Sequence, residues 1–518
     1  MPVLKNSANL RRSKWGRMPS CAPVANRRWP GMAQTAVVFV LLISLSLAAV
    51  SWTLAQGYTL YYGDAEAHLN IARRVLDSRT PGPEQFGTVW LPLPHLLMLP
   101  FVARDSLWRN GLAGAIPSAA AYVLAGTFLF AAARRAYDST AAAVAVAAAF
   151  AINPNLLYLQ STPMTEALFL AALMALLWAT LWFRESQSPI AVLTAAAASC
   201  AASLTRYEGW LLIPFVTLHF LITAKRKRHA IVFGVLASLA PLAWLAHNQF
   251  YYSNALEFFN GPYSAAAIYW RQKAAGMSPY PGDHDWLAAI KYYFAAAKLV
   301  CGPVLLILGA AGTLAIVAKR IFWPLLFLAI PPAFYIWSMH SFSAALFVPN
   351  LWPFSWYNTR YAITVLPFAA FACGALVLYL PARTRYIGAL AIAAGTITLS
   401  SVCWKESQVN SSARRDWTHQ AAAYLAANYR AGEGILYSFG DLTGILREAG
   451  IPLRETLHDG NHPAWEQVTA RPDLFLGEQW ALAFAGDPVS KLAARRYRMK
   501  KQMHVEGSPD VEIYHREP

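Results

Sequence analysis

Long apolar runs separated by short polar segments dominate the first 400 residues of the chain. A helix needs about 20 apolar residues to cross about 30 Å of hydrocarbon, because each residue advances it by about 1.5 Å. Runs that approach this length define a polytopic α-helical membrane protein. We predict about 11 transmembrane helices, at residues 34–55, 112–133, 138–152, 164–183, 189–204, 209–224, 230–247, 297–317, 321–337, 361–380 and 386–403.

The pattern changes after residue 403, where the long apolar runs end. Helical periodicity and short β-like runs then alternate, which predicts a small α/β domain over residues 404–518. Within this domain we expect helices at 413–429, 441–449 and 488–498, and strands at 435–439, 474–476 and 511–514.

The basic residues predict the orientation of the helices. With the N-terminus in the cytoplasm, the inner segments hold 18 Lys and Arg and two acidic residues, whereas the outer segments up to residue 403 hold 11 and 10. This is the positive-inside distribution. We therefore expect a multi-pass protein of the cell inner (plasma) membrane. Its parts are a cytoplasmic basic tail (1–33), a transmembrane domain (34–403) with external loops 56–111 and 248–296, and an extracytoplasmic domain (404–518).

Composition excludes several classes of protein. Of the 518 residues, 57% are hydrophobic and only 14% are charged, whereas soluble proteins are roughly a quarter charged. The net charge of +16 lies mostly in short clusters between apolar runs, so it reflects membrane orientation and does not indicate nucleic acid as a partner. The five cysteines have neither zinc-site spacing nor the pattern of a disulfide framework.

Candidate chemistry begins directly after the first apolar run, at Asp64. Apolar residues recur at helical spacing from residue 65 to 76, which predicts a helix lying on the membrane surface with Asp64 at its start. An N-cap would explain Asp64 without any function. Glu66 and His68 follow within one turn, however, and two carboxylates beside an imidazole suit a general base or a divalent metal ion.

Further candidates lie on other outer loops. Glu166 falls in the first turn of the fourth predicted span, where interaction with the helix dipole is the alternative explanation. A turn at 205–210 contains Arg206, Tyr207 and Glu208, which an aromatic belt with a local ion pair would also explain. Arg360 is the only basic residue of its loop. It is either a snorkelling side chain or a clamp for a lipid phosphate.

These segments resemble the GT-C superfamily of integral-membrane glycosyltransferases, in particular bacterial members of the family 39 type and the RgtA/B/C/D-like group. The similarity extends over roughly residues 30–400. It is carried by Gly-Asp-Ala-Glu-Ala-His at 63–68, Gly-Thr-Val-Trp-Leu-Pro-Leu-Pro-His at 87–95, Pro-Met-Thr-Glu at 163–166, Thr-Arg-Tyr-Glu-Gly-Trp at 205–210 and Tyr-Asn-Thr-Arg-Tyr at 357–361.

The resemblance implies inverting transfer of a sugar, on the outer face, from a polyprenyl-phosphate donor to an acceptor hydroxyl on a glycan, lipid or protein. Asp64 would be the general base. Some relatives have adjacent acidic residues where Ala65 separates Asp64 from Glu66, so a divalent metal cofactor stays open. The other implied roles are an acceptor or metal site (Glu66, His68, Glu166), binding of the lipid phosphate (Arg360, Arg206) and support of the site (Tyr207, Glu208, Tyr357).

Two other classes of protein fit a polytopic chain. A transporter or lipid flippase usually places ionisable residues near the bilayer midplane and often has repeated halves. Here the acidic residues lie at the outer ends of the predicted spans, and no repeat is visible. A non-catalytic scaffold or receptor would leave the outer carboxylates unexplained.

Overall fold

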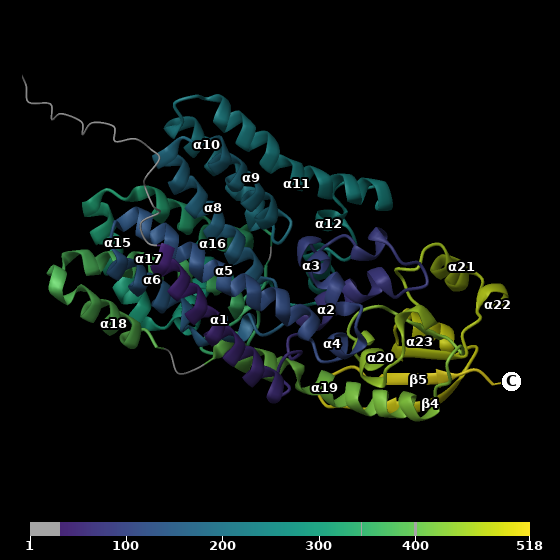
Figure 1. Ribbon diagram of the computed structural model, residues 1–518. Coiled ribbons are helices and arrows are strands. Elements are labelled where there is room, and N and C mark those ends of the chain that lie inside the picture. Colours follow the sequence, from purple (N-terminus) through teal and green to yellow (C-terminus); the bar gives the residue numbers. More distant parts are fainter. Residues whose placement is uncertain (1–31, 343, 398–400, 518) are drawn as a thin grey trace, which may run out of the picture.

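The computed structural model describes residues 32–342, 344–397 and 401–517, so most of the predicted cytoplasmic tail lies outside the described residues. Helices form a bundle in one half of the molecule, and a small sheet lies at the opposite end (Figure 1). Each of the eleven predicted apolar segments falls on helical structure. These helices are α1 (Met32–Ala55), α5 (Leu112–Tyr137), α6 (Thr140–Ala151), α8 (Glu166–Ser186), α9 (Pro189–Ser203), α10 (Glu208–Thr223), α11 (Arg228–Tyr252), α15 (Pro303–Lys319), α16 (Phe322–Ser341), α17 (Val365–Gly374) and α18 (Arg385–Gly395).

Six spans among the described residues are long and apolar enough to cross a membrane, or seven if one bent pair counts as a single span. The chain is therefore a multi-pass membrane protein, while the count of eleven crossings stays a prediction. The predicted helix 297–317 is in fact two helices. α14 (Trp286–Cys301) and α15 meet at 109°. Gly302 lies between them with a φ of +80°, a conformation that glycine adopts without steric cost.

The two predicted external loops contain short helices. The first holds α2 (Gly63–Leu76), η2 (Pro83–Phe86), α3 (Leu93–Val102) and α4 (Asp105–Arg109). The second holds α12 (Glu257–Asn260), α13 (Ala265–Ala274) and the start of α14. Elsewhere, α7 (Pro154–Leu159) precedes α8, η3 (Thr359–Thr364) leads into α17, and η4 (Ala375–Tyr379) and η5 (Ala382–Thr384) follow it.

A five-stranded sheet of order β2-β1-β3-β5-β4 forms the C-terminal end, as the α/β prediction requires. β1 pairs in parallel with β2 and β3, whereas β5 is antiparallel to β3 and β4. The strands are β1 (Ile435–Tyr437), β2 (Thr456–Leu457), β3 (Trp480–Phe484), β4 (Arg498–Met503) and β5 (Val511–His515). The helices are α19 (Val402–Asn428), α20 (Thr443–Ala449), η6 (Leu453–Glu455), α21 (Ala464–Ala470), α22 (Pro472–Phe475) and α23 (Pro488–Ala493).

The strand predicted at 474–476 is wrong, because α22 begins at Pro472 and covers most of it. Proline at the first position of a helix already has the φ that the helix needs. The predicted strands at 435–439 and 511–514 correspond to β1 and β5.

The first of the two predicted external loops and the C-terminal sheet share one apolar core. Leu69 of α2 and Met98 of α3 lie in the same buried cluster as Leu482 of β3 and Ile513 of β5. Figure 1 shows α2, α3 and α4 between the bundle and the sheet, with α19 running along both. The sheet region is therefore packed directly against the helix that carries Asp64.

Candidate functional site

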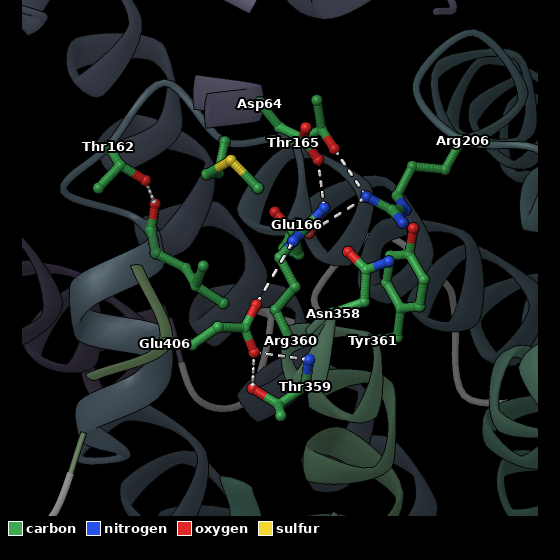
Figure 2. A network of polar contacts seen from close by, with 12 residues as sticks. Asp64, Thr162, Thr165, Glu166, Arg206, Asn358, Thr359, Arg360, Tyr361 and Glu406 are labelled. Carbon is green, nitrogen blue, oxygen red and sulfur yellow. Dashed lines mark hydrogen bonds and ion pairs between the residues drawn. The ribbon is translucent and has the colours of Figure 1, made fainter. Parts of the chain in front are cut away.

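Arg360 lies at the centre of a buried network of charged side chains (Figure 2). It belongs to η3, and its guanidinium forms an ion pair with Asp64 of α2. Its Nε lies 3.2 Å from Glu166 Oε1, and its Nη1 lies 3.7 Å from Glu406 Oε1. The predicted residues Asp64, Glu166 and Arg360 therefore converge, although they come from segments about 100 and 200 residues apart in the sequence.

Arg206, from the turn between α9 and α10, provides the second guanidinium. Its Nη1 lies 3.3 Å from Glu166 Oε1 and donates to Thr165 Oγ1 at 2.8 Å. Its Nε donates to Glu208 Oε1 at 2.9 Å, and its Nη2 donates to the hydroxyl of Tyr335. Glu166 thus bridges the two arginines, which keeps both guanidiniums beside one carboxylate.

Three helices begin at residues of this network. Glu166 is the first residue of α8, Glu208 is the first of α10, and Asp64 is the second of α2. Unpaired backbone N–H groups give each helix start a partial positive charge, which favours anions there. The dipole explanation for Glu166 is thus correct in part, but its carboxylate also contacts two arginines.

Burial separates Asp64 from the other carboxylates. Its side chain is 44% exposed, whereas that of Glu166 is 3% exposed and that of Glu406 is 1% exposed. The side chain of Arg360 is only 7% exposed. Burial of a charge without partners is costly, so these paired groups depend on one another. Asp64 is therefore the member of this network that is most accessible to a molecule from solvent.

Aromatic rings complete the surroundings of the two arginines. The Arg360 guanidinium lies 5.1 Å from the ring centroid of Tyr62 and 5.3 Å from that of Tyr361. The Arg206 guanidinium lies 5.7 Å from the Tyr361 ring and 5.9 Å from the Tyr335 ring. These cation–π contacts hold the guanidiniums in place and exclude water from them.

Carboxylates outnumber guanidiniums in the network. Asp64, Glu166, Glu208 and Glu406 carry two more negative charges than Arg206 and Arg360 provide, if all six are ionised. Burial raises the pKa of Glu406, although Arg360 and the hydrogen bonds from Thr359 act in the opposite direction. The raised pKa favours a neutral Glu406, which reduces the excess.

Asp64 does not cap its helix. Tyr62 is the N-cap residue of α2, and the helix start has no side-chain cap hydrogen bond. The carboxylate of Asp64 points to Arg360 instead. The N-cap interpretation is therefore wrong.

Glu66 and His68 do not join this network, contrary to the expectation that one helical turn would gather them with Asp64. Residues two apart in a helix differ by about 200°, so Asp64 and Glu66 point to opposite sides of α2. Glu66 Oε1 lies 2.8 Å from Arg447 Nη2, and Glu66 Oε2 lies 3.5 Å from Arg414 Nε. Glu66 therefore binds α2 to the C-terminal domain.

His68 lies in an aromatic pocket. Its Nδ1 is 2.9 Å from His95 Nε2, and its ring centroid is 4.4 Å from that of Trp90. Burial, with a smaller contribution from the positive charges of Arg206 and Arg360, lowers the pKa of His68 to about 3. His68 is thus neutral at physiological pH.

The metal candidates Glu66, His68 and Glu166 are not brought together. Glu66 and Glu166 lie against different arginines, and His68 lies against His95. Within the described ranges, no three His, Cys, Asp or Glu side chains form a group that could hold a metal ion. The residues proposed as ligands therefore do not fit a metal site.

The three supporting residues have different positions. Glu208 belongs to the network, as described above. Tyr207 donates from its hydroxyl to Val89 O at 2.7 Å and stacks on Phe258, which anchors the 87–95 segment. Tyr357 is 48% exposed and forms an isolated β-bridge with Phe347.

Sequence reasoning missed Glu406 and Tyr335, and it gave Thr359 no role beyond its place in the 357–361 motif. Glu406 Oε2 accepts a hydrogen bond from Thr359 N at 2.8 Å and another from Thr359 Oγ1. The hydroxyl of Tyr335 donates to Glu208. Glu406 follows the last predicted span by three residues, and a carboxylate so close to an apolar run was the available signal.

The raised pKa of Glu406 gives a pH test. A carboxyl group with a raised pKa in the folded state stabilises the fold below its ordinary pKa of 4.5, and this contribution is lost as pH rises through the folded pKa. We expect Glu406→Gln to remove this fall in stability, since glutamine keeps an acceptor for Thr359 without the charge. Thermal unfolding measured from about pH 4 to pH 8 tests this. Glu506→Gln, which changes an exposed carboxylate, is the control and should show the same pH dependence of stability as the wild type. If the stability of Glu406→Gln depended on pH in the same way as that of the wild type, the expectation would be contradicted.

The pKa of Glu66 is lowered, in contrast to that of Glu406. Burial raises its pKa, but Arg447 and Arg414 outweigh burial and lower it overall. Glu66 therefore stabilises the folded state at pH values above the ordinary pKa of a glutamate. This stabilisation is lost as the pH falls through the pKa that Glu66 has in the folded protein. We expect Glu66→Gln to lower the free energy of unfolding by about 3 kcal/mol at neutral pH, because two poorly exposed arginines lose their carboxylate. Chemical denaturation at neutral and acidic pH measures the difference, which should shrink in acid.

The matched control for Glu66→Gln is Glu448→Gln. Glu448 is an exposed carboxylate next to Arg447 in sequence and is paired with His419. Exposed pairs contribute about 0–1 kcal/mol, so this variant should unfold like the wild type. Equal losses in the two variants would show that Glu66 has no special role.

Comparison with known proteins agrees with the geometry. The family model of dolichyl-phosphate-mannose-protein mannosyltransferases matches residues 107–247, from the end of α4 into α11. Together with the fold, this match confirms the predicted resemblance to the GT-C superfamily of membrane glycosyltransferases. No curated protein matches the chain.

Among solved structures, ArnT from Cupriavidus metallidurans in the apo state has a similar fold. The TM-score is 0.53 at 15% sequence identity, and the match covers 93% of this chain and 98% of ArnT. The archaeal oligosaccharyltransferase AglB from Archaeoglobus fulgidus, in complex with an inhibitory peptide and a dolichol-phosphate, matches with a TM-score of 0.48 at 14% identity. That match covers 93% of this chain and 74% of AglB.

Proposed function

We propose that this protein is a glycosyltransferase of the inner membrane. It moves a sugar from a polyprenyl-phosphate donor to an acceptor hydroxyl on the extracytoplasmic face, with inversion at the anomeric carbon. The observation that carries this proposal is the ion pair between a half-exposed carboxylate, Asp64, and a buried guanidinium, Arg360. One group can take a proton from an acceptor, and the other can bind a phosphate.

Donor binding starts with Arg360. A lipid phosphate that reaches this guanidinium competes with Asp64, the most exposed of its carboxylate partners. Departure of Asp64 removes one carboxylate from Arg360, so the phosphate takes the place of a negative charge beside this guanidinium. The phosphate is also stabilised by nearby helix starts. Donor binding thus frees the base at the moment it is needed.

The transfer itself is a single displacement. Asp64 accepts the proton of the acceptor hydroxyl, and that oxygen forms a bond to the anomeric carbon from the side opposite the phosphate. The bond between the anomeric carbon and the phosphate oxygen breaks, and its electron pair stays on the phosphate. Arg360 and Arg206 stabilise the charge that develops there. Attack from the opposite side inverts the anomeric configuration.

No step of this proposal passes through a metal ion, because Glu66, His68 and Glu166 do not come together. Glu66 and His68, which the resemblance assigns to the acceptor or metal site, instead hold α2 in place. Their contacts with Arg447 and His95 fix the helix that presents Asp64.

A transporter is the second candidate, and the network argues against it. Transporters place ionisable groups near the bilayer midplane in broken helices. Here Asp64, Glu166 and Glu208 all lie in the first turn of their helices, and Arg360 links this network to α2 through Asp64 and to α19 through Glu406. This position suits a reaction at the membrane surface better than passage across it.

A reconstituted assay tests the proposed function. Purified protein in liposomes is supplied with polyprenyl-phosphate sugars carrying a radioactive label, together with an extract of the cell envelope. We expect labelled sugar to appear in the acceptor fraction with release of polyprenyl phosphate. Mass spectrometry of envelope glycans and glycoproteins from cells with and without the protein identifies the product. Flux of the labelled donor across the liposome without transfer would instead show a flippase.

A further inference from the structure

A second site adjoins the helix of Asp64. A cleft of about 1000 Å³ lies where the end of α1 and the end of α4 meet α19 and α20. Leu54 in the last turn of α1 lines it, and so do Tyr61 and Glu66, which lie on either side of Asp64 in the sequence. The sequence motifs and the proposed reaction leave this cleft unexplained.

Arginine dominates the less exposed part of the lining. Arg414, Arg415 and Arg447 are buried or half-buried, and the only carboxylate of the lining with comparable burial is Glu66. Arg109 and the other carboxylates that line the cleft are exposed. Those carboxylates are Asp416, Glu448 and Glu506. The inner wall therefore has two positive charges in excess.

Glu66 does not repel an anion from this wall, because Arg414 and Arg447 both pair with it. Arg415 has no such partner: within the part of the chain that the structure describes, it forms no ion pair with a carboxylate. Its guanidinium carbon lies 4.0 Å from the ring centroid of Tyr61, and its Nη1 donates to the Tyr61 hydroxyl at 3.2 Å. A guanidinium oriented in this way retains donors for a phosphate.

The cleft also lies beside an apolar surface. α1 is long and apolar enough to span the membrane, and only 17% of its apolar window is buried. Leu41, Leu47 and Trp52 on this helix are all exposed. A lipid whose chains lie along α1 would place its headgroup at the end of the helix, next to the cleft.

We propose that this cleft binds the phosphate headgroup of a membrane lipid, and that this lipid is the acceptor. The term acceptor rests on the proposed glycosyltransferase function, whereas the binding does not. Arg414 connects the cleft to the proposed base. A Cβ placed on Gly63 would lie 2.6 Å from Arg414 Nη1, so the guanidinium rests directly on the residue before Asp64. Asp64 itself does not line the cleft, so the headgroup would extend past Arg414 and Gly63 to bring a hydroxyl group to Asp64.

Native mass spectrometry of the full-length protein in detergent tests the binding. The probes are dioleoyl phosphatidic acid, which exposes a phosphate monoester, and dioleoyl phosphatidylcholine, whose phosphate is masked by choline. We expect the wild type to retain phosphatidic acid about tenfold better. Arg109→Gln combined with Arg415→Gln should remove this preference, because neither arginine holds a carboxylate that its loss would expose.

The control is Arg495→Gln, at an exposed arginine that does not line the cleft. It should keep the preference of the wild type. A wild type without preference, or a double variant that keeps it, would overturn the proposal. Displacement of phosphatidic acid by an equal concentration of inorganic phosphate would overturn the lipid as the source of the phosphate.

The Asp64→Asn variant tests lipid binding in the cleft and the proposed sugar transfer separately. It should keep the preference for phosphatidic acid while losing sugar transfer. If the variant keeps both, the base is wrong and the cleft stands. If phosphatidic acid never binds preferentially but transfer still depends on Asp64, the cleft is wrong and the proposed function stands.

Discussion

Asp64→Asn should reduce sugar transfer by about 10²–10⁴-fold, the range that a positioned general base contributes. Asparagine has nearly the same shape as aspartate and can still accept a hydrogen bond from Arg360, but it cannot take a proton from the acceptor. Because Asp64 is half-exposed, the variant should fold and unfold like the wild type. Initial rates with labelled donor in liposomes measure the effect.

Asp105→Asn is the matched control for this variant. Asp105 is also an exposed carboxylate, at the start of α4, and its Oδ1 lies 2.6 Å from Nη2 of the buried Arg73. It lies outside the network of Arg360, so transfer should be unchanged. Transfer retained by Asp64→Asn would rule out the proposed base, whereas equal losses in both variants would point to a general effect of weakened ion pairs.

Arg360→Gln should have the largest effect on folding. It leaves Glu166 and Glu406, both almost fully buried, facing a neutral side chain, and loss of one partner from a buried ion pair costs about 3–5 kcal/mol. Arg360→Lys keeps the charge but cannot contact three carboxylates from one planar group. We expect the lysine variant to fold with reduced stability and to lose transfer at least about 100-fold, as removal of a donor from a charge-stabilising site does. Thermal unfolding and liposome assays measure the two effects.

A second substitution separates the two effects. Adding Glu406→Gln to Arg360→Gln removes one of the two buried carboxylates that lost Arg360 as a partner, so it should restore part of the stability but none of the transfer. Arg383→Gln, at an exposed arginine, should leave both unchanged. Full transfer by Arg360→Lys would contradict the role of Arg360 in binding the lipid phosphate.

The helical fold followed from the sequence because membrane helices obey a simple length rule. A run near 20 apolar residues has few alternatives to a helix, since lipid offers no partners to backbone N–H and C=O groups. The break at Gly302 escaped prediction because apolar residues continue on both sides of it. The strands β3 and β4 were missed because pairing with β5 defines them more than their own composition does.

The sequence also identified the chemical groups of the site but not their partners. Asp64, Glu166, Arg206 and Arg360 were singled out because charged residues at the ends of apolar runs are unusual. Glu66 was assigned to the same cluster from its distance along the chain. Helical geometry directs it to the opposite side, where it meets Arg447.

By itself, the sequence determined that the chain is a multi-pass helical membrane protein and which charged residues lie at the ends of its helices. Apolar length and charge position are local properties, so they can be read along the chain. Only the tertiary structure decided which charges meet. Arg360 contacts Asp64, Glu166 and Glu406, which lie far apart in the sequence, because α2, α8 and α19 pack together around η3. A buried charge is tolerated only where such partners surround it, and no local pattern records them.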